Sequence, residues 1–360
     1  MKRHYLPPVK LLRTLLPAAL CWTAAISGLH YWFSRPELHP GEATEQSSHR
    51  YGLAYLPVTC HLTCPVTDYI SKSLNGQGFF DPVRFSGWPE LKESFLSGHT
   101  PAAFVLAPMA IALREDGVPL KMVYLGHRDG TAMMVRTDSD IHSIEDLRGK
   151  KIAVPNRFAN QRLLVYKALQ DHGLSVDDVT LVELAPPDMP VALYSGAVDA
   201  VTSGEPFMAQ TELDGYGRVL YLTKDVWPDF ISCVLVVQED LIRNDRAAVQ
   251  QLVDGIARSG KWLDESMDNR LDAAKFVARD YYNQDPELLS FVLSKPPDRV
   301  RYTHLALVKS QFEEIEVLAK QAGIIKGTAR FEDYADLSFV PDEEAVKAYD
   351  FDGSQPEATP

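Results

Sequence analysis

The stretch "LYSGAVDAVTSGEPF" (residues 193–207) has an earlier counterpart in the chain, "FLSGHTPAAFVLAPM" (residues 95–109). In both, an apolar residue precedes Ser-Gly, a short apolar run follows, and a proline comes after the run. A glycine that closes an apolar helical pattern is typical of a helix C-terminus, and the apolar run is typical of a buried strand. The sequence therefore predicts one unit written twice, with Pro108 and Pro206 at the carboxyl ends of two parallel strands.

The surrounding pattern extends each copy into a larger α/β unit. Short apolar runs alternate with helical stretches from Tyr51 to about Val135, and the alternation starts again at "KIAVP" (residues 151–155). Strands joined by helices form parallel sheets, and ligands of open α/β sheets bind at the carboxyl edges of the strands. We therefore predict two lobes that face each other across a cleft, with crossings near Val135 and Cys233.

The N-terminus differs in kind from the rest. Basic residues precede the apolar stretch "TLLPAALCWTAAISGLHYWF" (residues 14–33), which is the layout of a secretory signal or an N-terminal anchor. Both alternatives stay open, and both place the rest of the chain in the periplasm or at the extracytoplasmic face. The predicted organisation is a signal peptide or membrane anchor (1–34), a linker (35–50), lobe 1 (51–134 and 234–341), lobe 2 (135–233) and an acidic flexible tail (342–360).

Composition excludes some classes of function. The 360 residues carry a formal net charge of -13, whereas phosphate backbones require clustered Lys and Arg, so we expect no nucleic-acid partner. No Ser-His-Asp pattern typical of a hydrolase is recognisable. Of the four cysteines, Cys21 belongs to the targeting segment, Cys60 and Cys64 are neighbours, and Cys233 stands alone. A disulfide between Cys60 and Cys64 is compatible with export, but sequence does not decide it.

Two motifs carry a resemblance to a known family. "PPDMPVALYSGAVDAVTSGEPF" (186–207) and, less specifically, "DLRGKKIAV" (146–154) resemble the periplasmic substrate-binding components of ABC importers, over roughly residues 51–280. The most similar group serves nitrate, bicarbonate, sulfonate and taurine importers, with related thiamine-precursor binders. The resemblance implies an α/β, bilobal type II periplasmic binding protein fold with two mixed or parallel sheets. It also implies no catalysis, no cofactor, a monomer, and delivery of a solute to an ABC permease.

The first candidate ligand residues lie in "TCHLTCPVT" (59–67), between the first strand and the next helix. A helix N-terminus offers free N–H donors that suit an anion, which makes Thr59, Cys60 and His61 candidates. A metal centre on Cys60, His61 and Cys64 is an alternative, but three groups with no second Cys/His pair make a poor site. We therefore expect no metal there.

The next candidates follow the second and third strands. Trp88 offers an apolar wall and one N–H donor, and the resemblance implies that a tryptophan at this place lines the pocket. Its alternative is a core tryptophan at a helix start. Pro108 shapes the pocket floor through its backbone, or is purely structural.

The remaining candidates lie near the first crossing and in lobe 2. Arg128 could form a bidentate pair with an oxyanion, with Asp129 and Thr131 beside it, or could pair with Asp129 at the surface. Asn160 and Gln161 open the first helix of lobe 2. The resembling anion binders carry a histidine there and this chain does not.

Two arginines and one glutamate bear on the charge of the predicted cleft. Arg157 and Arg162 could supply the charge that the missing histidine provides elsewhere, or could be solvated. Glu205 would repel an anion and attract an amine, or would only orient the site. Alternative functions are a thiamine-pyrimidine-precursor binding or synthesis protein and a membrane-anchored sensory ectodomain.

Overall fold

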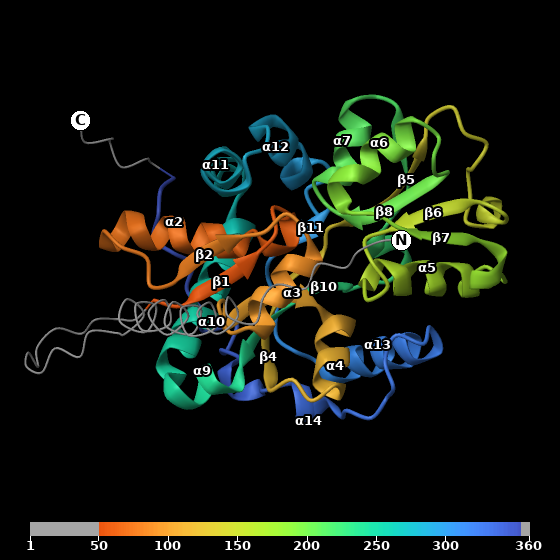
Figure 1. The fold of residues 1–360 in the computed structure, drawn as a ribbon. Coiled ribbons are helices and arrows are strands. Elements are labelled where there is room, and N and C mark those ends of the chain that lie inside the picture. The colour runs from red at the N-terminus through yellow and green to blue at the C-terminus, as the bar shows by residue number, and fades with distance from the viewer. Residues whose placement is uncertain (1–49, 354–360) are drawn as a thin grey trace, which may run out of the picture. The chain divides into compact units, whose positions relative to one another are not determined.

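Two mixed sheets carry the strands of the computed structural model, which describes residues 50–353 (Figure 1). The predicted signal or anchor, and the linker up to residue 49, lie outside the described residues. None of the helices in the described part is long and apolar enough to cross a membrane. The predicted fold class, an α/β protein with two mixed sheets in a bilobal arrangement, is confirmed.

The sheet of lobe 1 has an antiparallel strand, β10, at its centre. β3 pairs parallel with β1, β1 pairs parallel with β2, and β10 pairs antiparallel with both β3 and β4. Within the described residues the six strands lie in the order β11 (Val300–Arg301), β4 (Leu120–Asp129), β10 (Ile231–Gln238), β3 (Ala102–Leu106), β1 (Gly52–Tyr55) and β2 (Asp81–Arg84).

The sheet of lobe 2 repeats part of this arrangement. β8 pairs parallel with β6 and antiparallel with β5, and β6 pairs parallel with β7. The sequence β10-β3-β1-β2 of the first sheet thus corresponds to β5-β8-β6-β7 of the second. The order across the described strands is β7 (Thr180–Glu183), β6 (Lys151–Val154), β8 (Ala200–Gly204), β5 (Thr131–Arg136) and β9 (Gly217–Leu222).

The duplicated sequence is therefore a duplicated place in the fold. In the first copy α3 (Trp88–Leu96) ends before Gly98, and β3 follows; in the second, α6 (Met189–Tyr194) ends before Gly196, and β8 follows. Gly98 and Gly196 have φ of 78° and 71°, a left-handed conformation that side chains disfavour, so glycine stops both helices. Each strand in turn leads into a new helix, α4 (Ala107–Glu115) or α7 (Phe207–Leu213).

The chain crosses between the lobes slightly earlier than the sequence predicts. β4 ends at Asp129 and β5 begins at Thr131 in the other sheet, so Gly130 is the first crossing. The return crossing ends at Ile231, where β10 enters the first sheet. Residues 131–134 thus belong to the sheet of lobe 2, and residues 231–233 to that of lobe 1.

Helices cover the faces of both sheets, and so the central strands are buried along their whole length: β3 and β8 are buried at every residue. The other helices before the return crossing, with 3-10 turns labelled η, are η1 (Thr59–His61), α2 (Thr63–Asn75), η2 (Glu145–Leu147), α5 (Asn160–Asp171), η3 (Val176–Asp178), η4 (Pro186–Asp188) and α8 (Thr223–Val226).

The chain after β10 is mainly helical and packs chiefly on lobe 1, although α12 also contacts α7 and α13 contacts α5 of lobe 2. Its elements are α9 (Glu239–Asn244), α10 (Arg246–Glu265), α11 (Met267–Val277), the π turn η5 (Ala278–Tyr282), α12 (Pro286–Ser294), α13 (Lys309–Gln321), α14 (Phe331–Tyr334) and η6 (Leu337–Phe339).

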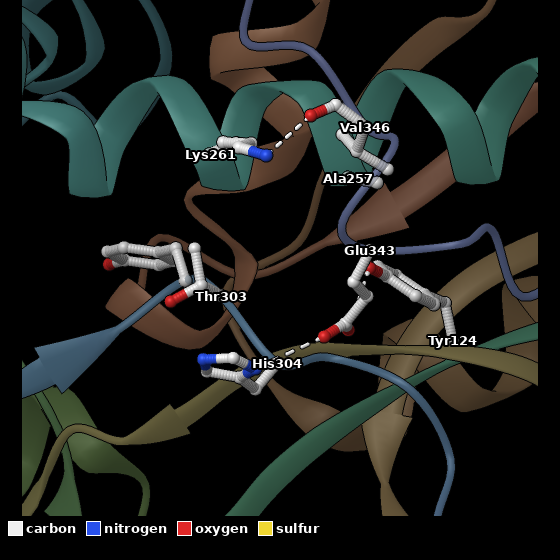
Figure 2. Close-up of a pocket in the computed structure, with 8 residues that line it drawn as sticks. Tyr124, Ala257, Lys261, Thr303, His304, Glu343 and Val346 are labelled. Carbon is white, nitrogen blue, oxygen red and sulfur yellow. Dashed lines mark hydrogen bonds and ion pairs between the residues drawn. The ribbon is translucent and has the colours of Figure 1, made fainter.

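Residues 342–353 belong to the stretch whose composition suggests a loose tail, yet they make specific contacts. Lys261 Nζ donates to the carbonyl of Val346 at 2.6 Å, and Trp262 Nε1 donates to that of Phe351 at 2.9 Å. Figure 2 shows Val346 of this segment beside Lys261 of α10, and Glu343 directed toward His304. Both residues line a cavity of about 210 Å³.

Candidate functional site

A cavity of about 340 Å³ lies between the carboxyl edges of the two sheets, a volume within the range of small-molecule sites. Its walls come from the loops after β2 and β3 in lobe 1 and after β6 and β7 in lobe 2. We call it the interlobe pocket. Its lining residues are Gly87, Trp88, Pro89, Lys92, Met109, Pro155, Asn156, Arg157, Phe158, Glu183, Leu184, Ala185 and Pro186.

Trp88 forms part of the lobe 1 wall of this pocket. It is the first residue of α3, and its side chain is 7% exposed. Its indole Nε1 is buried and has no hydrogen-bond partner among residues 50–353. A buried N–H group without an acceptor is energetically unfavourable. A ligand that places a hydrogen-bond acceptor beside this N–H group would remove that cost and bind more favourably.

Positive groups outnumber negative ones in the pocket lining. Lys92 lies one turn after Trp88, and Arg157 enters from lobe 2 with its guanidinium carbon 4.6 Å from the ring centre of Phe158. The amide Nδ2 of the adjacent Asn156 is buried and unpartnered within the described chain. Glu183 is the one acidic residue of the lining. The donors therefore favour an anionic group, and the aromatic and proline walls favour an apolar one beside it.

Behind Trp88 the two lobes touch directly, along a surface that we call the seam. The Thr59 backbone N–H of η1 donates to the carbonyl of Glu205 in lobe 2 at 2.8 Å, and Thr59 Oγ1 lies 3.3 Å from the same oxygen. A methyl group placed on Gly204 would lie 3.9 Å from the Sγ of Cys60. The end of β8 thus rests against η1, with a glycine where the thiol approaches.

A buried ion pair joins the two lobes at the seam. The Glu205 side chain is fully buried, accepts the Ala209 N–H at 2.8 Å and lies 3.5 Å from Arg299 Nη1. Burial raises the pKa of Glu205, and the Arg299 charge and the Ala209 hydrogen bond oppose that rise. Arg299 also donates to Glu212 at 2.8 Å. Glu205 is therefore committed to protein partners, consistent with the orienting role among its predicted alternatives.

Two histidines occupy the lobe 1 side. His61 Nδ1 accepts the Leu56 N–H at 2.7 Å, and its ring lies edge-on to Trp88 with 5.7 Å between ring centres. The other nitrogen of His61 and both ring nitrogens of His127 are buried without hydrogen-bond partners in the part of the chain that the structure describes. The seam therefore adjoins the interlobe pocket through the His61–Trp88 contact.

The predicted ligand residues Asn160 and Gln161 lie at the crossings. Asn160 Nδ2 donates to the carbonyl of Ser232 at 3.2 Å and to that of Ile231, and Gln161 Nε2 donates to Thr131 Oγ1 at 3.0 Å. Asn160 thus joins lobe 2 to the start of β10, and the donors that were expected to face a solute are used within the protein.

Arg128 also differs from its expected role. Its guanidinium donates to the carbonyls of Asp229, at 2.8 Å, and of His304, at 2.5 Å. A third, longer contact reaches Ala306 at 3.4 Å. The sequence predicts a bidentate pair with an oxyanion, whereas in this structure the guanidinium donates to backbone carbonyls.

The neighbours predicted together with Arg128 are also held by protein groups. Asp129 accepts from Arg301 at 2.9 Å, and burial raises the pKa of its carboxyl against that pairing. Pro108 is buried in the first turn of α4, and its neighbour Met109 is the residue that reaches the pocket.

Sequence reasoning missed several residues that the fold brings to these places. The pocket uses Asn156, Phe158 and the turn over residues 184–186, and the seam uses His127 and Arg299. The "PPDM" motif that begins at Pro186 carried a usable signal for the turn. Arg299 carried none, because it pairs with a residue more than ninety positions away.

The chain matches a family model described as NMT1-like over residues 46–278, more than half of its length. It is 24% identical over 201 residues to a nitrate import ATP-binding protein, NrtC, of Synechocystis, covering 51% of this chain and 30% of that protein. The chain thus spans about a quarter to a half of the length of the curated relatives at the head of the comparison.

Solved structures share the fold at low identity. A ligand-binding component of an ABC-type import system from Staphylococcus aureus, solved with zinc bound, has a TM-score of 0.73 at 22% identity, over 83% of this chain and 99% of that one. The alkanesulfonate-binding protein SsuA from Xanthomonas axonopodis, bound to MOPS, has 0.67 at 18%, over 82% and 100%. A desulfurization enzyme, DszB, has 0.58 at 16%, over 82% and 98%.

Proposed function

Because the chain belongs to the NMT1-like family, we propose that it is the solute-binding component of an ABC importer, which captures a small anionic solute between its lobes. It works at the extracytoplasmic face, as a monomer, and delivers the solute to a membrane permease. Support comes from relatives that are named as nitrate import and alkanesulfonate-binding proteins. A role in binding without catalysis is part of this proposal.

The observation that carries the choice of solute is the lining of the interlobe pocket. On lobe 1, the buried Trp88 Nε1–H has no acceptor among the described residues. On lobe 2, Arg157 lines the same cavity. An anion that bridges the two lobes would satisfy both, and charge-assisted hydrogen bonds are the stronger kind. Met109 and Phe158 add apolar walls. We therefore favour an organic anion such as a sulfonate over nitrate or bicarbonate.

Thermal unfolding of the purified protein with separate ligands tests this proposal. The panel is nitrate, bicarbonate, alkanesulfonates, a pyrimidine and an amine. A ligand that binds only the folded state stabilises it by about 2.7 kcal/mol at a hundredfold excess over Kd, so the midpoint should rise with an alkanesulfonate. Arg157→Gln should remove the shift, and Lys224→Gln, whose exposed partner Asp298 lies outside the pocket, should keep it.

Other outcomes separate the alternatives. A shift with the pyrimidine alone would replace the anion by a thiamine-precursor ligand. A shift with the amine alone would assign the pocket to Glu183 instead of Arg157. No shift with any member of the panel would remove the transport role, and would leave the sensory ectodomain as the function to test.

A further inference from the structure

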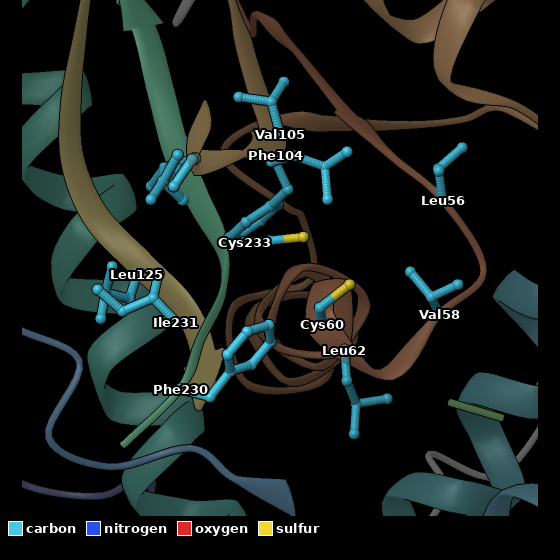
Figure 3. Close-up of a cluster of buried hydrophobic side chains, with 14 of the residues drawn as sticks. Leu56, Val58, Cys60, Leu62, Phe104, Val105, Leu125, Phe230, Ile231 and Cys233 are labelled. Carbon is cyan, nitrogen blue, oxygen red and sulfur yellow. The ribbon is translucent and has the colours of Figure 1, made fainter. Parts of the chain in front are cut away.

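Two thiols meet inside the seam, although they lie far apart in the sequence. Cys60 belongs to η1 and Cys233 to β10, and both side chains are buried. Their sulfur atoms lie within 4.8 Å of each other and of a ring nitrogen of His61. Figure 3 shows both cysteines in one cluster of buried side chains, with the sulfur of Cys233 turned toward Cys60. Cys60, Cys64 and Cys233 are all free thiols in the structure.

The hydrogen bond to His61 decides which nitrogen of that ring carries a proton. Nδ1 accepts the Leu56 N–H, so Nδ1 has no proton and Nε2 carries it. A metal ion bound at Nε2 would need the opposite tautomer, in which Nδ1–H would oppose the Leu56 N–H. The group of Cys60, His61 and Cys233 therefore suits a sulfur anion beside an N–H donor better than a metal ion.

The electrostatics of the two thiols differ in the way that thiol exchange requires. Burial by itself would raise the pKa of Cys60, but Cys233, His61 and His127 outweigh it and hold that pKa well below the ordinary thiol value. The pKa of Cys233 is well above that value, through burial and the neighbouring Cys60. The thiolate is the nucleophile in exchange, and reactive cysteines commonly lie next to a resolving thiol.

We propose that Cys60 and Cys233 form a thiol–disulfide exchange site that accepts a small-molecule disulfide, with Cys60 as the attacking thiolate and Cys233 as the resolving thiol.

The proposed thiol–disulfide exchange takes two steps. Cys60 Sγ bonds to one sulfur of the small disulfide, whose S–S bond breaks and releases one thiolate. That thiolate takes the proton of Cys233, and Cys233 Sγ then attacks Cys60 Sγ and expels the second thiolate. The two protein thiols are oxidised to one disulfide, and the small disulfide is reduced to two thiol molecules, one of them ionised.

The placement at the seam gates this chemistry. Cys60 faces Gly204 of lobe 2, and the Thr59–Glu205 hydrogen bond closes the seam beside it. A small disulfide reaches the sulfur when the lobes separate. The structure also supplies a matched control, because Cys64 is equally buried four residues later while burial and Asp68 raise the pKa of its thiol.

The test uses the full chain, fully reduced and then exposed to oxidised glutathione. Free thiols are alkylated, and the bonds are mapped by peptide mass spectrometry. We expect a Cys60–Cys233 cross-link in the wild type and in Cys64→Ser. We expect a stable glutathione adduct on Cys60 in Cys233→Ser. It should form on the order of ten times faster than any adduct on Cys64 at the same pH, because the pKa of Cys60 is lowered and that of Cys64 is raised.

Three results would overturn the proposal. The first is a Cys60–Cys64 bond in place of the Cys60–Cys233 bond. The second is a Cys60 that stays unmodified in both the wild type and Cys233→Ser. The third comes from titration with Zn²⁺ alone: stoichiometric binding by the reduced wild type that is lost in Cys60→Ser would assign the thiols to a metal centre. Because the wild-type map alone decides the first result, the proposal stays testable if a substituted chain fails to fold.

Discussion

The interlobe pocket and the seam share the His61–Trp88 contact, yet they treat polar groups in opposite ways. In the pocket, Lys92 and Arg157 lie at the edge of a cavity, where solvent or a solute can reach them. In the seam, Glu205 and Arg299 are withdrawn from water and depend on each other. We therefore expect substitutions in the pocket to change ligand binding, and substitutions in the seam to change the stability of the fold.

The strongest test of this contrast is Arg299→Met, which keeps the volume and removes the counter-charge of Glu205. Breaking a buried pair from one side costs about 3–5 kcal/mol. The pKa of Glu205 is already raised in the folded state, and it should rise further without Arg299. When folding raises the pKa of a carboxyl group, the protein loses stability as pH increases through the folded-state pKa. Denaturant unfolding of Arg299→Met should therefore show a larger loss of stability at pH 8 than at pH 5.

The control for this prediction adds Glu205→Gln to Arg299→Met. Without the buried carboxyl, the loss of stability should no longer depend on pH. An equal loss at both pH values in the single variant would show that packing, and not charge, holds this side of the seam.

The second test addresses the close approach of η1 to β4. A methyl group on Gly126 would lie 2.4 Å from the carbonyl oxygen of Cys60, so Gly126→Ala forces backbone to move. Overpacking of this kind costs about 1–3 kcal/mol. Gly87→Ala is the control, because its methyl group would meet the end of the Glu90 side chain at 2.7 Å and the Pro89 ring at 3.5 Å, and no backbone atom. Unfolding midpoints should separate the two, and equal midpoints would contradict the rigid placement of η1.

The third test returns to the pocket. Arg157→Gln should weaken the binding of an alkanesulfonate by about 1.5–3 kcal/mol, as expected for a hydrogen bond to a charged group. The unfolding midpoint of the free protein should stay unchanged, because Arg157 lines a cavity. Calorimetric titration measures the first quantity and a melting curve the second. A large drop in the midpoint would place Arg157 with the seam residues instead.

The smallest effect is expected for Trp88→Phe. It keeps an apolar wall and removes the Nε1–H, so binding should weaken by about 0.5–1.5 kcal/mol, the net value of one hydrogen bond. The same titration measures it. Unchanged affinity would mean that Trp88 serves the pocket by its shape alone.

The elements of this fold were predictable where the signal is local. Gly98 and Gly196 each adopt a left-handed backbone conformation that ends a helix, and this signal depends on a single residue. The apolar runs after them are typical of buried strands, and they form β3 and β8. Trp88 was a candidate because it follows a predicted strand, and because the family resemblance implies a pocket tryptophan at this place. The first crossing carries no such local signal, because β4 ends at Asp129 and β5 begins at Thr131, so Gly130 alone separates strands of two different sheets.

The seam was not predictable in the same way. Cys233 meets Cys60, and Arg299 meets Glu205, only because β10 and the loop after α12 return to the first lobe. The sequence suggested Cys64 as the partner of Cys60, because the two residues are close along the chain and a sequence does not reveal proximity in the fold. For Arg128, the acceptors are backbone carbonyls more than a hundred residues away. Because every residue has a backbone carbonyl, the sequence does not indicate which ones will accept.

The central position of β10 bears on how the protein is made. During synthesis, residues 50–130 emerge before the rest of the described chain and contain strands β1 to β4 of the lobe 1 sheet. That sheet stays divided between β3 and β4 until residues 231–238 arrive. Contacts between such distant segments form slowly, since a long loop must close first. The ribosome will therefore have delivered the chain up to about residue 238 before β3 and β4 acquire their shared neighbour.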